Sequence, residues 1–121
     1  MSWDLNNNCP IYMQVLDIIR LKIITGEYKP GDKLPSIRDL AVESSVNPNT
    51  IQKAIFILEQ SGLIIPQRTV GKFITEDTNM INKAKNEIAN KTIIEFIKKF
   101  EVLGITKDEL IEKIKNVKGD N

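Results

Sequence analysis

The sequence predicts a mainly α-helical fold with one small β-hairpin, in which a two-helix segment follows an N-terminal domain. Apolar residues recur at three- and four-residue spacing in five segments, which is the periodicity of helices that bury one face. Turn-forming residues such as Pro30, Gly31 and Gly62 separate these segments. Two short runs, 63–65 and 72–75, favour β-strand. The expected strands therefore belong to a single hairpin.

The first helix is predicted to run from Pro10 to about Thr25. Proline is tolerated in a first helical turn because its missing N–H would have no partner there. Gly26 is expected to end the helix, and the turn residues around Pro30 and Gly31 predict a loop over 27–35. The apolar positions that give the helical spacing are Ile11, Val15, Ile18, Ile19 and Ile23.

Two capped helices follow the loop. Ser36 is a predicted N-cap that accepts from the backbone of Asp39, whose side chain is expected to reach back. That helix stops near Ser45, and Asn47 caps the next one, with Pro48 at its first position. Two helices joined by such a short turn form a helix-turn-helix pattern.

The hairpin completes the N-terminal domain. The strand-forming runs are separated by residues 66–71, and Arg68 and Lys72 make its tip basic. A helix, a helix-turn-helix and a hairpin in that order are the layout of a winged helix. We therefore predict a winged helix-turn-helix over residues 1–75.

Residues 76–121 predict two further amphipathic helices. An apolar stripe runs from Ile81 to Phe100, Gly104 breaks it, and residues 106–109 form a capping box for the last helix. Helices this short do not bury their apolar faces alone, so they need the first domain or a second copy of the chain. We interpret residues 76–121 as a helical dimerisation segment.

The composition argues against an enzyme and against a metal site. The 121-residue chain has no histidine and one cysteine, Cys9, so the usual zinc or iron sites and the Ser–His or Cys–His pairs cannot be assembled. The sequence contains no run of 18 apolar residues, the length that would indicate a membrane span, and its N-terminus lacks a signal-peptide pattern. We expect no cofactor and a cytoplasmic location. The net charge of +1 is neutral about DNA binding.

Several short motifs between residues 10 and 75 match one known family. They are Pro10-Ile11-Tyr12, the string Pro30-Gly31-Asp32-Lys33-Leu34-Pro35-Ser36 with Arg38, and Asn47-Pro48-Asn49-Thr50 with Leu58-Glu59 and Gly62-Leu63-Ile64. These residues resemble the GntR family of bacterial transcriptional regulators. The Asn47-Pro48-Asn49-Thr50 motif and the short two-helix segment are similar to the YtrA-like subfamily. The frequent wing sequence Arg-Gly-x-Gly is only partly matched, by residues 68–71.

The resemblance implies a DNA-binding regulator without a large sensor domain. Other GntR subfamilies carry domains that bind acids, sugars, metals or pyridoxal phosphate, whereas about 45 residues follow the predicted wing here. The resemblance therefore gives no reason to expect an effector pocket, a metal or an enzyme activity. Whether a small-molecule effector binds stays open.

The second helix of the predicted helix-turn-helix, which begins after Asn47, has a polar face, and this face is the predicted base-reading surface. Asn and Gln side chains bond adenine, and Lys bonds guanine. The alternative for these residues is an ordinary solvated helix surface, and for Asn47 capping alone is a sufficient role. The predicted DNA-binding residues of this helix are Asn47, Asn49, Thr50, Gln52 and Lys53.

Further DNA contacts are predicted on the preceding helix and on the wing. Arg38 lies where a cation opposes the helix dipole, and the resemblance implies that it contacts DNA. The alternative is an ion pair with Asp39 or Glu43. Ser36 is a cap and a candidate phosphate contact. At the wing, we expect Arg68 and Lys72 to reach phosphates or the minor groove, with Gly71 allowing a tight tip.

We expect a sequence-specific regulator, a repressor, that binds an inverted-repeat operator as a homodimer. Two recognition helices about 34 Å apart would read successive major grooves of double-stranded DNA. One alternative is a winged-helix module that binds a protein, although its recognition helix would be apolar. Another is a plasmid replication initiator, although these are usually longer. The sequence leaves activation or repression, the operator and the regulated genes open.

Overall fold

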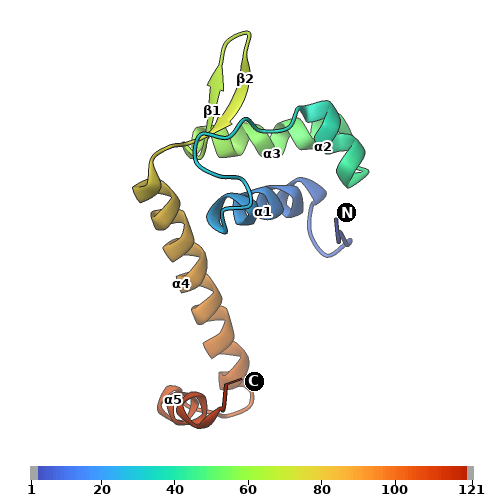
Figure 1. Ribbon diagram of the computed structural model, residues 1–121. Coiled ribbons are helices and arrows are strands. Elements are labelled where there is room, and N and C mark those ends of the chain that lie inside the picture. Colours follow the sequence, from blue (N-terminus) through green and yellow to red (C-terminus); the bar gives the residue numbers. More distant parts are fainter. Residues whose placement is uncertain (1–2, 120–121) are drawn as a thin grey trace. The chain divides into compact units, whose positions relative to one another are not determined.

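Five helices and one antiparallel hairpin make up the computed structural model, which describes residues 3–119 (Figure 1). In chain order the elements are α1 (Ile11–Ile24), α2 (Ile37–Ser44), α3 (Pro48–Gln60), β1 (Ile64–Gln67), β2 (Gly71–Ile74), α4 (Thr78–Val102) and α5 (Lys107–Asn116). This order confirms the predicted fold class, a winged helix-turn-helix followed by two helices. The chain divides into one compact unit that runs to Ala84 and a second that begins at Lys85.

The core of the first unit lies between α1, α2, α3 and the hairpin. Helix α3 contacts α1, α2 and β1, so it is the central element of this unit. Burial of each large aliphatic side chain stabilises the fold by about 1.5–3 kcal/mol. The largest fully buried side chains are Ile19, Ile23, Leu40, Ile51, Ile55, Leu58, Ile64, Ile74 and Val15.

Side-chain caps begin both helices of the helix-turn-helix, as predicted. The Ser36 Oγ accepts from the Asp39 backbone N–H at 3.0 Å. The Asn47 Oδ1 accepts from the Asn49 N–H at 2.7 Å, and Pro48 occupies the first turn of α3. Within residues 3–119, Asp39 makes no return bond to Ser36, so only half of the expected reciprocal pair forms. Its shorter side chain reaches less far than the Glu or Gln usual at that position.

A left-handed residue closes the turn between α2 and α3. Ser45 has φ +59°, a conformation that costs a non-glycine residue about 1 kcal/mol. Two backbone bonds hold it there, Ser45 N–H to Val42 O at 3.4 Å and Val46 N–H to Ala41 O at 3.2 Å. Val46 is buried directly after the turn. This closure sets where α3 begins relative to α2.

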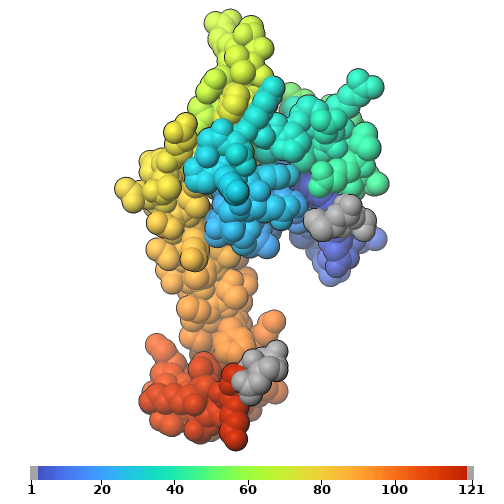
Figure 2. Space-filling view, in the orientation of Figure 1, coloured from blue at the N-terminus to red at the C-terminus, as the bar shows by residue number. Residues whose placement is uncertain are grey.

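The hairpin is longer than predicted, and the loop before α2 joins it. The pairing runs from Ile64–Ile74 to Gln67–Gly71, so the tip is residues 68–70 and not 66–71. Pro66 lies within β1, an edge strand where a missing N–H is tolerated. On the other side of β2, Gly31 N–H and Leu34 N–H donate to Ile74 O and Lys72 O at 3.0 and 2.8 Å. Figure 2 shows the hairpin projecting beyond the helices of the first unit.

A polar cluster around the buried side chains of Trp3 and Lys22 ties the N-terminal segment to α1 and α2, and its two acids, Glu27 and Glu43, are exposed. Trp3 is 9% exposed, and its Nε1 donates to Glu43 at 2.9 Å. Lys22 is 6% exposed, pairs with Glu27 at 2.7 Å, and lies 5.9 and 5.7 Å from the Trp3 and Tyr28 ring centres. Burial, and then the charges of Glu43 and Glu27, raise the pKa of Tyr28 to about 12.

The first turns of α4 belong to the first unit. Ile81 is buried in its core, and Met80 and Ala84 pack against that core. This packing is why the unit extends past the end of the hairpin near residue 75. A Cβ at Gly62, whose φ is +86°, would come within 2.7 Å of Met80 Sδ. No helix within residues 3–119 is long and apolar enough to cross a membrane.

In the second unit, α4 ends and α5 begins at the predicted residues. Gly104, with φ +78°, follows α4, and the Ile105 N–H donates to Phe100 O at 3.0 Å. The Thr106–Glu109 capping box is complete. Its hydrogen bonds from the Thr106 backbone and hydroxyl lower the pKa of the Glu109 carboxyl. Their contribution to stability is therefore present above the ordinary carboxyl pKa and is lost as the pH falls through the lowered one.

Removing the carboxylate of Glu27 tests the polar cluster. We expect Glu27→Ala to lower the free energy of unfolding by about 1–2 kcal/mol, because the Lys22 ammonium loses its partner while it stays buried. Urea denaturation followed by circular dichroism measures the loss. Lys22→Met, which keeps the apolar stem and removes the charge, should stay within about 1 kcal/mol of the wild type. Equal losses in both variants would contradict this account.

Candidate nucleic-acid interface

Helix α3 has one buried stripe and one exposed polar face. Ile51, Ala54, Ile55 and Leu58 are buried, as the apolar spacing predicts. Core packing therefore turns a different set of side chains toward solvent. Thr50 is half-buried between the two faces. The exposed side chains in the first part of the helix are Asn49, Gln52, Lys53 and Phe56.

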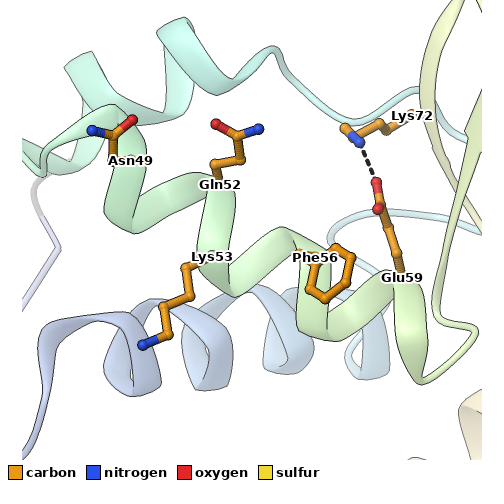
Figure 3. Close-up of a pocket in the computed structure, with 6 residues that line it drawn as sticks. All are labelled: Asn49, Gln52, Lys53, Phe56, Glu59 and Lys72. Carbon is orange, nitrogen blue, oxygen red and sulfur yellow. Dashed lines mark hydrogen bonds and ion pairs between the residues drawn. The ribbon is translucent and has the colours of Figure 1, made fainter.

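The exposed face of α3 and Lys72 of β2 line a surface hollow of about 330 Å³ (Figure 3). Asn49 and Gln52 point to one side of α3, and Lys53 points to the other, toward α1. Phe56 lies between Gln52 and Glu59 along the helix. The hollow thus brings two predicted base-reading amides together with an aromatic ring that was not predicted to take part.

Lys53 has an aromatic partner within the first unit. Its Nζ lies 3.9 Å from the centre of the Tyr12 ring on α1. Such a cation–π contact is worth about 0.5–1 kcal/mol at an exposed site. The Tyr12 ring thus packs against a side chain of α3. For Lys53 to reach guanine, its side chain has to leave this ring.

Lys72 is paired with an acid on α3. Its Nζ contacts the Glu59 carboxylate, and the two side chains are 33% and 14% exposed. The pair joins α3 to β2, as the dashed line in Figure 3 marks. It also places a negative charge beside a predicted phosphate contact. Sequence reasoning missed this pair because Glu59 and Lys72 are 13 residues apart in different elements.

Arg38 is exposed in the first turn of α2. Within residues 3–119 it forms no ion pair with Asp39 or Glu43, which was the alternative to a DNA contact. Glu43 instead accepts from Trp3. The Arg38 guanidinium is therefore available to an anionic partner.

Ser36 lies beside the wing in a second hollow, of about 270 Å³. The loop before α2 and the start of β2 line it, bringing Ser36 together with Gly71, Lys72 and Lys33. Lys33 was not predicted as a site residue, although its basic side chain in the Pro-Gly-Asp-Lys string was a signal for it. Gly71 has φ +138°, a backbone conformation that other residues rarely adopt, and a Cβ there would also displace the end of the Lys33 side chain, whose Cε would lie 2.8 Å away.

The wing tip is exposed and its backbone is strained. Arg68 is exposed there, with Val70 52% exposed beside it. Thr69 has φ +64°, which is unfavourable for a β-branched residue. The Val70 N–H donates to Gln67 O at 3.1 Å and closes the tip. The tip therefore presents one cation on a tightly turned backbone.

A winged helix whose capped second helix presents polar side chains beside a basic hairpin defines a DNA-binding transcriptional regulator. Residues 11–74 match the family model described as bacterial regulatory proteins, gntR family. The chain belongs to the GntR family. The proteins of this family that it resembles are transcriptional regulators and not enzymes.

Relatives match the chain beyond the winged helix. It is 33% identical over 118 residues to the HTH-type transcriptional repressor YtrA of Bacillus subtilis, which covers 97% of this chain and 91% of that protein. A GntR family transcriptional regulator from Listeria monocytogenes is 40% identical, with a TM-score of 0.86 over 94% of this chain and all of that one (100%). The AraR DNA-binding domain, solved in complex with operator ORX1, is 28% identical with a TM-score of 0.57 over 62% of this chain.

The Glu59–Lys72 pair gives a testable consequence for DNA binding. Glu59→Gln keeps an oxygen acceptor but removes the charge that holds Lys72. We expect affinity for duplex DNA to rise a few-fold, and the slope of log affinity against log salt to steepen by about one unit. Fluorescence anisotropy at several salt concentrations measures both. Glu95→Gln on α4 removes the same charge elsewhere, and an equal change in that control would refute the assignment.

Proposed function

We propose that this regulator is a repressor that binds an inverted-repeat operator as a homodimer in the cytoplasm. Helix α3 enters the major groove, and the hairpin lies on the backbone or in the minor groove. The observation that carries the proposal is the exposed face of α3, where Asn49 and Gln52 point to one side of the helix and share a hollow with Lys72 of the hairpin. The operator-bound AraR domain and the repressor name of YtrA support it.

The proposed DNA contacts divide into base-reading and backbone groups. Asn49 and Gln52 read bases, and Lys53 joins them when it leaves Tyr12. Phosphate contacts position the protein on the duplex without reading its sequence. Lys72 contacts a phosphate only when its side chain leaves Glu59. The proposed backbone group comprises Ser36, Arg38, Asn47, Thr50, Arg68, Gly71 and Lys72.

The proposed dimer rests on the apolar surface of residues 76–121. The second unit leaves several large apolar side chains in water, which is unfavourable by about 25 cal/mol for each Å² of apolar surface. A second copy of the chain offers the same helices and covers them by symmetry. The exposed side chains are Ile93, Ile94, Phe96, Val102, Leu103, Ile111, Ile114 and Val117. A net charge of only +1 attracts DNA weakly, and two linked winged helices would bind DNA more tightly than one.

Arg38→Ala tests the DNA-binding assignment. We expect about a tenfold loss of affinity for the chain's own promoter region, because an unpaired guanidinium near the duplex is removed. Gel-shift titration measures the loss, and a reporter under that promoter should rise in expression. Arg20→Ala removes an arginine that is paired with Asp17 on α1, and it should leave both readouts unchanged. Equal affinity of the wild type and Arg38→Ala would exclude this role for Arg38.

Substitutions on α4 test the dimer. The wild type should sediment as a dimer at micromolar concentration, and Ile93→Glu with Ile94→Glu should shift it toward monomer because charges replace the covered apolar surface. Analytical ultracentrifugation measures the mass. Leu21→Glu, on the exposed surface of α1, is the matched control and should stay dimeric. A wild-type monomer that binds a single half-site specifically would overturn the proposal.

A further inference from the structure

Phe56 is an exposed aromatic residue on the face of α3 that is proposed to read DNA. Its side chain is 57% exposed, although an aromatic ring is stabilised by burial. It lies in the hollow with Asn49 and Gln52 and outside the core cluster of the first unit. The core therefore does not account for a phenylalanine at this position.

Helical geometry places Phe56 at the middle of the exposed face. It lies two turns after Asn49 and about one turn after Gln52, and these spacings put all three on one side of the helix. The buried positions Ala54 and Leu58 flank the opposite side. Phe56 lies about 10 Å along the axis from Asn49, a length of roughly three base-pair steps.

The cations near Phe56 have partners inside the protein. Lys53 lies over the Tyr12 ring, and Lys72 contacts Glu59. What the centre of the hollow offers a ligand is therefore two side-chain amides and one apolar ring. In the major groove, amides bond adenine, and apolar side chains contact the 5-methyl group of thymine.

We propose that Phe56 contacts the 5-methyl group of a thymine in each operator half-site, so that α3 reads A·T pairs through its amides and its ring together. The inference rests on the proposed function, because it requires α3 in the major groove. It assigns a specificity role to a residue that the sequence pattern left unassigned. A phenylalanine with this role makes an apolar contact to DNA, so its ring has to be exposed in the unbound protein, as it is here.

Replacement of thymine by uracil tests the contact, since it removes only the methyl group. The operator is first located by footprinting on the chain's own promoter region. Each thymine of a synthetic duplex is then replaced in turn, and affinity is measured by fluorescence anisotropy. We expect a loss of about three- to tenfold at one thymine in each half-site, the scale of one buried methyl group. That thymine should lie about three base pairs from the position at which Asn49→Ala relaxes specificity.

Variants of Phe56 separate the contact from other roles. Phe56→Ala should bind the thymine and uracil duplexes equally, and Phe56→Leu, which stays apolar, should keep part of the discrimination. Leu21→Ala, which truncates an equally exposed apolar residue on α1, should keep all of it. Circular dichroism is expected to show unchanged folding, because the Phe56 ring is mostly in water.

Two results would overturn the inference. The wild type could bind every uracil duplex as tightly as the thymine duplex, or Phe56→Ala could keep the discrimination between the two duplexes. Each of these leaves operator binding intact, whereas a wild type without any sequence-specific binding would refute the proposed function as well.

Discussion

The packing of α3 against α1 determines the surface that this protein presents to a partner. Ile51, Ala54, Ile55 and Leu58 are buried, and close packing of such side chains allows a helix little rotation about its axis. The direction of Asn49, Gln52 and Phe56 follows from that burial. The caps at Ser36 and Asn47 and the left-handed Ser45 then set where α2 and α3 begin and end. The apolar core therefore decides where the polar face lies.

Several cations of the first unit have a partner inside the protein. Lys22 is paired with Glu27, Lys72 contacts Glu59, and Lys53 lies over Tyr12. These contacts hold helices, loop and hairpin together, and each withdraws a positive charge from the surface. Among the predicted DNA-contacting residues, Arg38 and Arg68 are exposed cations that form no ion pair within residues 3–119. The proposed DNA binding therefore depends on individual positioned cations and on the proposed linkage of two winged helices more than on net charge.

Features that act over three or four residues could be predicted from the sequence, and contacts between distant segments could not. The caps at Ser36, Asn47 and Thr106 and the break at Gly104 depend on local backbone geometry, so their residue types identify them. The pairing of residues 31–34 with β2, the Trp3–Glu43 bond and the Glu59–Lys72 pair depend on tertiary structure, and no spacing rule encodes them. Phe56 was missed because a helical pattern sorts residues into apolar-buried and polar-exposed, and it belongs to neither group.

The polar cluster around Trp3 also has an optical consequence. Trp3 is the single tryptophan of the sequence, and its indole N–H is bonded to Glu43 on α2, with the Lys22 ammonium 5.9 Å from its ring. Indole emission depends on nearby charges and on access of water to the ring. The protein thus carries one indole fluorophore, and it is hydrogen-bonded to the first helix of the helix-turn-helix. Its emission reports on the position of α2 without any added label.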